Sequence, residues 1–272
     1  MSNLVIIRGG GDIASGVIQK FHRCGFKVLV LEVANPSFIR SSVSFGGAIY
    51  DNEVILEEST AIFAKNIHEI NTILKNDNIA VAIDPSGQLI SELKPLIVID
   101  AILAKKNLGT TIDMAPITIG LGPGFEAKKD VDIVIETMRG HDLGKLIFHG
   151  CPMENTGVPG LIGGYCVERV IYSTTSGVIQ NQKQIGDIVT KGEVIAIIEE
   201  SQIIAPISGI LRGIIRDGYE VPSNFKIADI DPRIEEVKNC FTISDKARTV
   251  GGAALEGALI LLNKLGVLWK EK

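Results

Sequence analysis

The chain has 272 residues, of which 46% are hydrophobic and 22% are charged, and its formal net charge is −5 at pH 7. This length provides one large domain or two ordinary domains with an ample core, and the composition is that of a globular protein. The negative charge argues against a nucleic-acid binder, and no basic stripe with interleaved aromatic residues is seen.

The sequence predicts a cytoplasmic protein that does not enter a membrane. Its first apolar run is short and continues into Arg8 and three glycines, so no signal peptide is expected, and no apolar run reaches the length of a membrane span. The cysteines are scattered without CxxC spacing, which is typical of reduced thiols. His149 and Cys151 are two soft ligands without a second pair, so we expect no metal site.

The chain begins with a strand, a glycine turn and a helix. Gly9, Gly11 and Ala14 fit the pattern G-x-G-x-x-A, which is typical of the first turn of a dinucleotide-binding βαβ unit. There the glycines let backbone N–H groups approach a phosphate at a helix N-terminus. Arg8 adds a cation that suits a more anionic ligand than a dinucleotide. A structural turn without a ligand is an equal alternative.

Three carboxylates are expected at the ends of buried strands. Glu32 follows the glycines by about 20 residues, where such units place an acid that binds a ribose hydroxyl. Continuous apolar runs at 79–83 and 96–99 predict parallel strands that end in Asp84 and Asp100. These acids would lie at the edge where open α/β sheets bind ligands, but each could instead cap the following turn, which is the commoner role.

Residues 107–165 alternate apolar segments with glycines and prolines, and we expect them to form the wall of a ligand pocket. Asp113 lies in an uncharged run, so it is expected to be partly buried, either as a functional carboxylate or bonded to nearby backbone. Arg139 and His141 follow a predicted strand and suit a phosphate clamp or an acid–base pair, with a solvated turn as the alternative.

Residues 170–231 contain a weak internal repeat of short strands and glycine turns, which predicts a compact β-sandwich or barrel. The repeat resembles the hammerhead of biotinyl and lipoyl carrier domains. The expected hairpin tip, residues 200–202, has no lysine, which argues against a carrier and favours a packing or docking module. A helix over 245–265, with Ser244 as its N-cap, is expected to pack on the first domain.

The sequence therefore predicts an α/β protein with a Rossmann-like parallel sheet and an inserted small β barrel-sandwich module. The expected domains are the Rossmann-like domain with the glycine-rich pocket segment, the module and the C-terminal helix, over residues 1–165, 166–240 and 241–272.

Several strings together resemble one family, the YqeB-like accessory proteins of selenium-dependent molybdenum hydroxylases. The strings are Ile7–Gly16, Ile39–Arg40 with Val43–Phe45, Asn107–Pro116, Gly120–Phe125, Glu136–Gly144, Asn155–Gly164 and Ile243–Arg248. The first part is also distantly similar to maturation factors of xanthine dehydrogenase. The resemblance implies a maturation factor that holds a molybdopterin cofactor or helps its sulfur or selenium ligand to enter. The implied partner is a hydroxylase client, and the oligomeric state is left open.

The candidate cofactor-binding residues follow from the glycine turn and the charged positions beyond it. Arg8, Gly9, Gly10, Gly11 and Asp12 would hold a phosphate of a molybdopterin or nucleotide ligand. Glu32 and Asp113 would bond the heterocycle or ribose, and further charge would come from Arg40, Arg139 and His141.

An NAD(P)-dependent oxidoreductase is the alternative function. It rests on the glycine pattern and Glu32, and its one candidate proton donor is His141. The cation at Arg8 does not suit this alternative.

Overall fold

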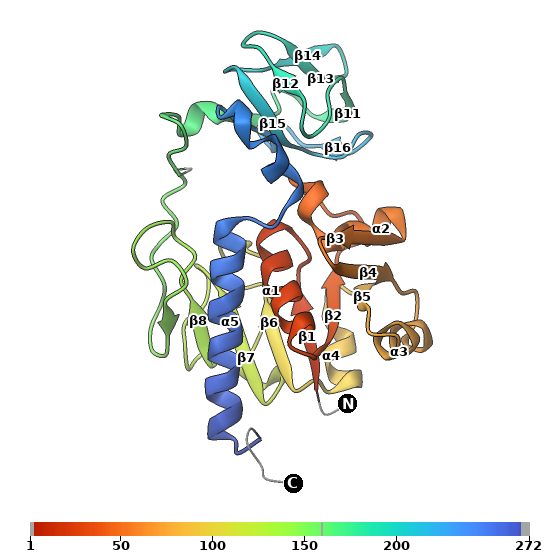
Figure 1. Ribbon diagram of the computed structural model, residues 1–272, viewed down its shortest axis with the longest axis vertical. Helices are drawn as coiled ribbons and strands as arrows, with labels where there is room; N and C mark the ends of the chain where they lie inside the picture. The colour runs from red at the N-terminus through yellow and green to blue at the C-terminus, as the bar shows by residue number, and fades with distance from the viewer. Residues whose placement is uncertain (1–2, 159, 268–272) are drawn as a thin grey trace. The chain divides into compact units, whose positions relative to one another are not determined.

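The computed structural model describes residues 3–158 and 160–267 (Figure 1). Pro159, which belongs to one of the family strings, and the outermost residues of the expected first and last domains lie outside this description. The chain divides into two compact units. The first holds the described residues of Met1–Pro36, Phe45–Asn155 and Ile243–Lys272, and the second those of Ser37–Ser44 and Thr156–Thr242. The short segment Ser37–Ser44 thus joins the second unit, which the sequence did not predict.

A nine-stranded sheet forms the centre of the first unit, in the order β3-β4-β5-β2-β1-β6-β7-β8-β9. The central strands, β4-β5-β2-β1-β6-β7-β8, pair in parallel. The edge strand β3 is antiparallel to β4, and the edge strand β9 is antiparallel to β8. The strands are β1 (Leu4–Arg8), β2 (Lys27–Glu32), β3 (Glu53–Leu56), β4 (Ser59–Phe63), β5 (Ile79–Ile83), β6 (Ile97–Asp100), β7 (Ile117–Leu121), β8 (Ile133–Ile135) and β9 (Leu146–Ile147).

The predicted fold class, a Rossmann-like parallel sheet with an inserted barrel-sandwich module, is wrong. The sheet is mixed, because a hairpin closed at Glu57 and Glu58 adds β3 to one edge, and β9 returns antiparallel at the other. Glu57 has φ +54° and so supplies the left-handed residue that this tight connection needs. The second unit is likewise no simple insertion, since Ser37–Ser44 contributes to it.

Helices cover both faces of this sheet (Figure 1). One face packs on α3 and α4, as Leu29 and Leu31 of β2 share a buried cluster with Ile70 and Ile90. The other face packs on α1 and α5. The helices are α1 (Asp12–Arg23), α2 (Ala48–Asp51), α3 (Ile67–Lys75), α4 (Gln88–Leu93) and α5 (Asp245–Lys264), with short 3-10 turns η2 (Phe45–Gly47) and η3 (Ile112–Met114).

Helices α1 and α5 touch backbone to backbone. A Cβ on Gly16 would lie 2.0 Å from the carbonyl oxygen of Ala247, and a Cβ on Gly251 would lie 2.3 Å from that of Gly16. Neither position has room for a side chain. The N-cap of α5 is Ser244, whose Oγ accepts a hydrogen bond from the Ala247 N–H at 3.2 Å, as its sequence predicts. The two glycines therefore hold the first turns of α1 and α5 close together.

The second unit contains two four-stranded antiparallel sheets around an isoleucine-rich core. Their orders are β10-β17-β15-β12 and β14-β13-β11-β16. The strands are β10 (Val170–Tyr172), β11 (Gly177–Asn181), β12 (Ile188–Val189), β13 (Val194–Ile198), β14 (Ser201–Ile204), β15 (Gly209–Ile214), β16 (Glu220–Val221) and β17 (Lys226–Asp231), with the 3-10 segments η1 (Ser41–Val43), η4 (Val167–Arg169) and η5 (Ile234–Phe241). Over residues 3–158 and 160–267, no helix has the length and apolar character needed to cross a membrane.

Candidate functional site

The carboxyl ends of the parallel strands in the first unit carry a row of charged side chains. Arg8 ends β1, Glu32 ends β2, Asp100 ends β6, and Asp84 and Glu136 directly follow β5 and β8. Ligands of open α/β sheets bind at this edge, and a charge there is available to a ligand only where protein groups do not already satisfy it.

Asp84 is a turn cap. Its Oδ1 accepts hydrogen bonds from Ser86 Oγ at 3.0 Å and the Gly87 N–H at 2.9 Å, and its Oδ2 accepts from the Leu89 N–H at 2.8 Å. These bonds fix the start of α4. The structural role that the sequence favoured for this acid is what the geometry supports.

Arg8 is buried and bound to protein groups. Its guanidinium donates to Thr110 Oγ1 at 2.5 Å and to the Pro85 carbonyl at 3.2 Å, and lies 3.7 Å from Asp100 Oδ2. Thr110 in turn donates to Asp100 at 2.6 Å, and burial raises the pKa of that carboxyl. Arg8 therefore ties the turns after β5 and β6 together, rather than presenting its cation to a ligand.

The first two glycines of the turn are needed by neighbouring backbone. Gly9 has φ +94° and donates its N–H to the Leu31 carbonyl at 2.8 Å. A Cβ on Gly10 would lie 2.7 Å from Gly46 Cα, and the Gly10 N–H bonds to the Glu32 carboxylate. The expected phosphate cradle of Gly9 and Gly10 amides is thus replaced by protein contacts. Gly11 is the N-cap of α1, and helix geometry leaves the first N–H groups of α1, from Asp12 onward, without partners in the helix.

Glu32 is the least satisfied acid at this edge. Burial raises its pKa to about 7, against hydrogen bonds from the Val33 and Gly10 backbone that lower it. Its Oε2 is inaccessible to solvent and has no hydrogen-bond partner among the described residues. A buried carboxyl with a free oxygen and a pKa near neutrality is typical of functional sites. The acid that the sequence singled out therefore has a vacant acceptor.

Glu136 holds two loops together. Its carboxylate is 2% exposed, and its two oxygens accept hydrogen bonds from the Met138 and Met153 N–H groups, each at 2.7 Å. This anchor joins the segments after β8 and β9 within the glycine-rich stretch. The segment is therefore held in a defined conformation, but both Glu136 oxygens are already engaged by backbone N–H groups.

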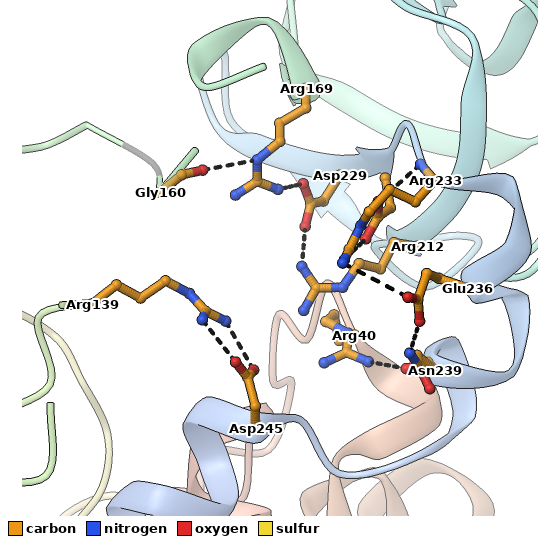
Figure 2. Close-up of polar contacts among 11 residues, drawn as sticks. Arg40, Arg139, Gly160, Arg169, Arg212, Asp229, Arg233, Glu236, Asn239 and Asp245 are labelled. Carbon is orange, nitrogen blue, oxygen red and sulfur yellow. Dashed lines mark hydrogen bonds and ion pairs between the residues drawn. The ribbon is translucent and has the colours of Figure 1, made fainter. Parts of the chain in front are cut away.

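The remaining predicted site residues lie on the surface or in the other unit. Arg139 is exposed and donates both terminal nitrogens to Asp245 at 3.0 and 3.1 Å, which clamps the start of α5 (Figure 2). His141 lies on an exposed turn. Asp113 is exposed in η3, so its expected burial is wrong. Arg40 belongs to the second unit, where it is 6% exposed and donates to the Asn239 carbonyl at 2.9 Å.

Lys246 is the functional candidate that sequence reasoning missed. It is the second residue of α5 and is partly buried, with no hydrogen bond or ion pair to the rest of the described chain. Burial and next the charge of Arg139 lower its pKa, while Asp12, Glu136 and Asp245 raise it. A lysine in the first turn of a helix opposes the helix dipole, and that was the sequence signal available.

These features converge on one edge of the first unit. The Gly16 and Gly251 contacts bring the first turns of α1 and α5 together, and Lys246 lies within electrostatic range of Asp12, Glu136 and Arg139. The positive ends of two helix dipoles and a cation without a bonded partner are groups that bind a phosphate or carboxylate. Within the described ranges, no group of three or more His, Cys, Asp or Glu side chains is placed to hold a metal.

The buried acids of the second unit are paired with arginines. Arg169 and Arg212 both bond Asp229, and Arg233 bonds Asp231 at 2.9 and 2.7 Å (Figure 2). Asp229 and Asp231 are 5% and 3% exposed, so each needs these partners. We assign this network to the stability of β15 and β17 rather than to ligand binding.

Comparisons with known proteins add one informative relative. The chain is 49% identical over 261 residues to the uncharacterized protein YqeB of Escherichia coli strain K12, a match that covers 96% of this chain and 48% of that protein. The chain thus spans about half the length of this relative. The match confirms the YqeB-like part of the expected resemblance. No protein-family model matches the chain.

Similar solved structures include an aspartoacylase family protein from Mesorhizobium loti, at 13% identity with 84% of each chain covered and a TM-score of 0.25. Another is a succinylglutamate desuccinylase/aspartoacylase from Rhodobacter sphaeroides, at 10% identity, 84% and 85% coverage and a TM-score of 0.27. At these scores the likeness supports no argument about fold or activity.

Proposed function

We propose that this YqeB-like chain is an accessory factor in the maturation of a selenium-dependent molybdenum hydroxylase and binds a phosphate-bearing cofactor at the strand edge of its first unit. The family strings and the similarity to YqeB support the pathway. The observation that carries the binding role is Lys246, a partly buried cation without a bonded partner among the described residues, in the first turn of α5.

The chemistry of the edge suits a cofactor with a phosphate at one end and a polar ring at the other. Lys246 and the N–H groups at the start of α1 would receive the phosphate, because both present positive charge to the same space. Glu32 would accept a hydrogen bond from a hydroxyl or ring N–H through its unpartnered Oε2, which a rotation of the carboxyl group would have to uncover. Molybdopterin and nucleotides both combine these groups. When bound, a molybdopterin would supply the dithiolene that carries molybdenum to the client.

The proposal is tested by ligand binding to the purified chain. Protein isolated from a host that makes molybdopterin is analysed by native mass spectrometry, and a panel of GTP, CTP and NAD is titrated by calorimetry. We expect one phosphate-bearing ligand to bind, and Lys246→Met to weaken it roughly tenfold. Lys20→Met, in the last turn of α1, is the matched control and should leave the affinity unchanged. Failure of every ligand to bind, or equal losses in both variants, would contradict the proposal.

The buried free oxygen of Glu32 also favours the alternative of an NAD(P)-dependent oxidoreductase. Glu32 ends β2, where an acid can accept a ribose hydroxyl. A thermal-shift comparison with NAD and NADP separates the two proposals. Stabilisation by either dinucleotide that disappears in Glu32→Ala, together with hydride transfer to the bound cofactor, would favour the oxidoreductase.

A further inference from the structure

A cavity opens on the face of the same sheet opposite to Glu32. It has a volume of about 360 Å³ and lies at the ends of β4 and β5, between α3 and α4. Its residues include Ala82, which faces the α3 and α4 side of the sheet, whereas strand alternation turns Glu32 to the α1 side. The cavity is therefore separate from the proposed cofactor site.

Small residues form the floor of this cavity. Ala64 and Ala82 occupy neighbouring positions at the ends of β4 and β5, and both are almost fully buried. Large apolar side chains stand around them, and two of these, Ile67 and Ile83, are 37% and 43% exposed. The alanines leave a hollow whose lining combines apolar side chains with polar and charged groups, and its volume lies in the range of small-ligand pockets.

The polar groups around the cavity divide into those bonded within the protein and those that are exposed to solvent without a protein partner. Asp84 is saturated by its three hydrogen bonds, and the Asn66 side chain both donates to Glu69 and accepts from its N–H. In contrast, the ammonium of Lys65 and the carboxylate of Glu92 have no bonded partner in the described part of the chain. These two opposite charges come from different elements, the loop before α3 and the helix α4.

We propose that this cavity binds a small zwitterion with an apolar body, of the class of apolar α-amino acids. The apolar walls receive the side chain, Lys65 pairs with the carboxylate and Glu92 pairs with the ammonium. A ligand with one charge alone would leave the other rim charge unmatched. This inference is independent of the cofactor site, because no residue is shared between the two.

The test titrates the full chain by calorimetry with L-leucine and L-phenylalanine, and with two analogues of leucine, 4-methylpentanoate and 3-methylbutylamine, which each lack one charge. We expect at least one amino acid to bind at millimolar concentration or below, and each analogue to bind roughly fivefold more weakly than leucine or worse. No binding by either amino acid, or equal binding by leucine and its analogues, would overturn the proposal.

Matched variants locate the binding. Lys65→Met and Glu92→Gln should each weaken the amino acid roughly fivefold, because each removes one exposed ion pair. Lys75→Met, at the other end of α3, removes an exposed lysine outside the cavity and should have no effect. Circular dichroism verifies that all three variants fold. Equal losses in Lys65→Met and Lys75→Met, or no loss in either rim variant, would place the ligand elsewhere and overturn the assignment.

Discussion

At the scale of single residues, the charges along the strand edge have two different roles. Four of them are bonded to protein groups and hold the loops that follow the strands, namely Arg8, Asp84, Asp100 and Glu136. Glu32 and Lys246 are partly buried and retain unused hydrogen-bonding capacity. Polar capacity left unused where water is largely excluded costs stability, so its retention points to a ligand.

The raised pKa of Glu32 predicts a pH-dependent stability. The folded-state pKa of about 7 exceeds the ordinary glutamate value of 4.5, so between these two pH values the unfolded chain releases the proton that the folded chain keeps. Stability from this group is therefore present at low pH and is lost as the pH rises toward 7. The Glu32→Gln side chain cannot ionise, so the variant does not lose this stability. The difference in free energy of unfolding between variant and wild type should therefore grow in favour of the variant by up to about 3 kcal/mol from pH 4.5 to pH 8.

This difference is measured by urea unfolding followed by circular dichroism at the two pH values. A difference between variant and wild type that stays constant across the range would contradict the raised pKa.

Glu136 should control the loops after β8 and β9. Glu136→Ala leaves the Met138 and Met153 N–H groups without their acceptor, at a cost of about 1–3 kcal/mol for each partly buried hydrogen bond to the charged carboxylate. Hydrogen–deuterium exchange should speed up at these two amides, with β1 and β2 unchanged. Unaltered protection of both amides would show that the carboxylate is not their anchor.

At the scale of elements, the contact between α1 and α5 is the feature that builds the cofactor site. It brings two first turns together and needs Gly16 and Gly251, whose added Cβ atoms would overlap the backbone of the facing helix.

Gly16→Ala should therefore be strongly destabilising. Its Cβ has no room beside Ala247, so the helices must separate, which is expected to cost about 1–3 kcal/mol or more. Gly252→Ala on α5 is the matched control, since a Cβ there meets nothing within 4 Å and alanine favours helix by about 1 kcal/mol. Thermal unfolding of the two variants should shift in opposite directions. A fall in both, or in neither, would contradict the close contact.

At the scale of the whole molecule, a short segment from the first fifth of the chain completes the second unit. Ile39 packs on the isoleucine core, and Ser42 Oγ donates to the Cys240 carbonyl at 2.6 Å. A fragment spanning 156–242 alone should unfold at lower urea concentration than the same fragment fused through a flexible linker to residues 37–44. Equal midpoints would mean that Ser37–Ser44 adds nothing to the unit.

The sequence predicted those elements whose signals are local. Continuous apolar runs gave the buried strands β1, β2, β5 and β6, and Ser244 gave the start of α5. Features that depend on distant pairing were missed. The need for glycine at position 10 comes from its close contact with Gly46, and the electrostatic environment of Lys246 comes from Asp12 and Glu136. Spacing along the chain does not reveal these contacts. The glycine pattern likewise predicted a ligand at this turn, but contacts with neighbouring backbone are sufficient to explain why residues 9 and 10 are glycines.

The most direct measurement of the central claim observes Lys246 itself. Lysine amines labelled with ¹³C-methyl groups by reductive methylation give one NMR signal each, assigned through Lys246→Arg. The Lys246 signal should titrate at lower pH than the signals of exposed lysines such as Lys75, because burial lowers its pKa. Addition of the phosphate-bearing ligand should shift it and raise its pKa. A Lys246 signal that stays unchanged while that ligand binds would contradict the account.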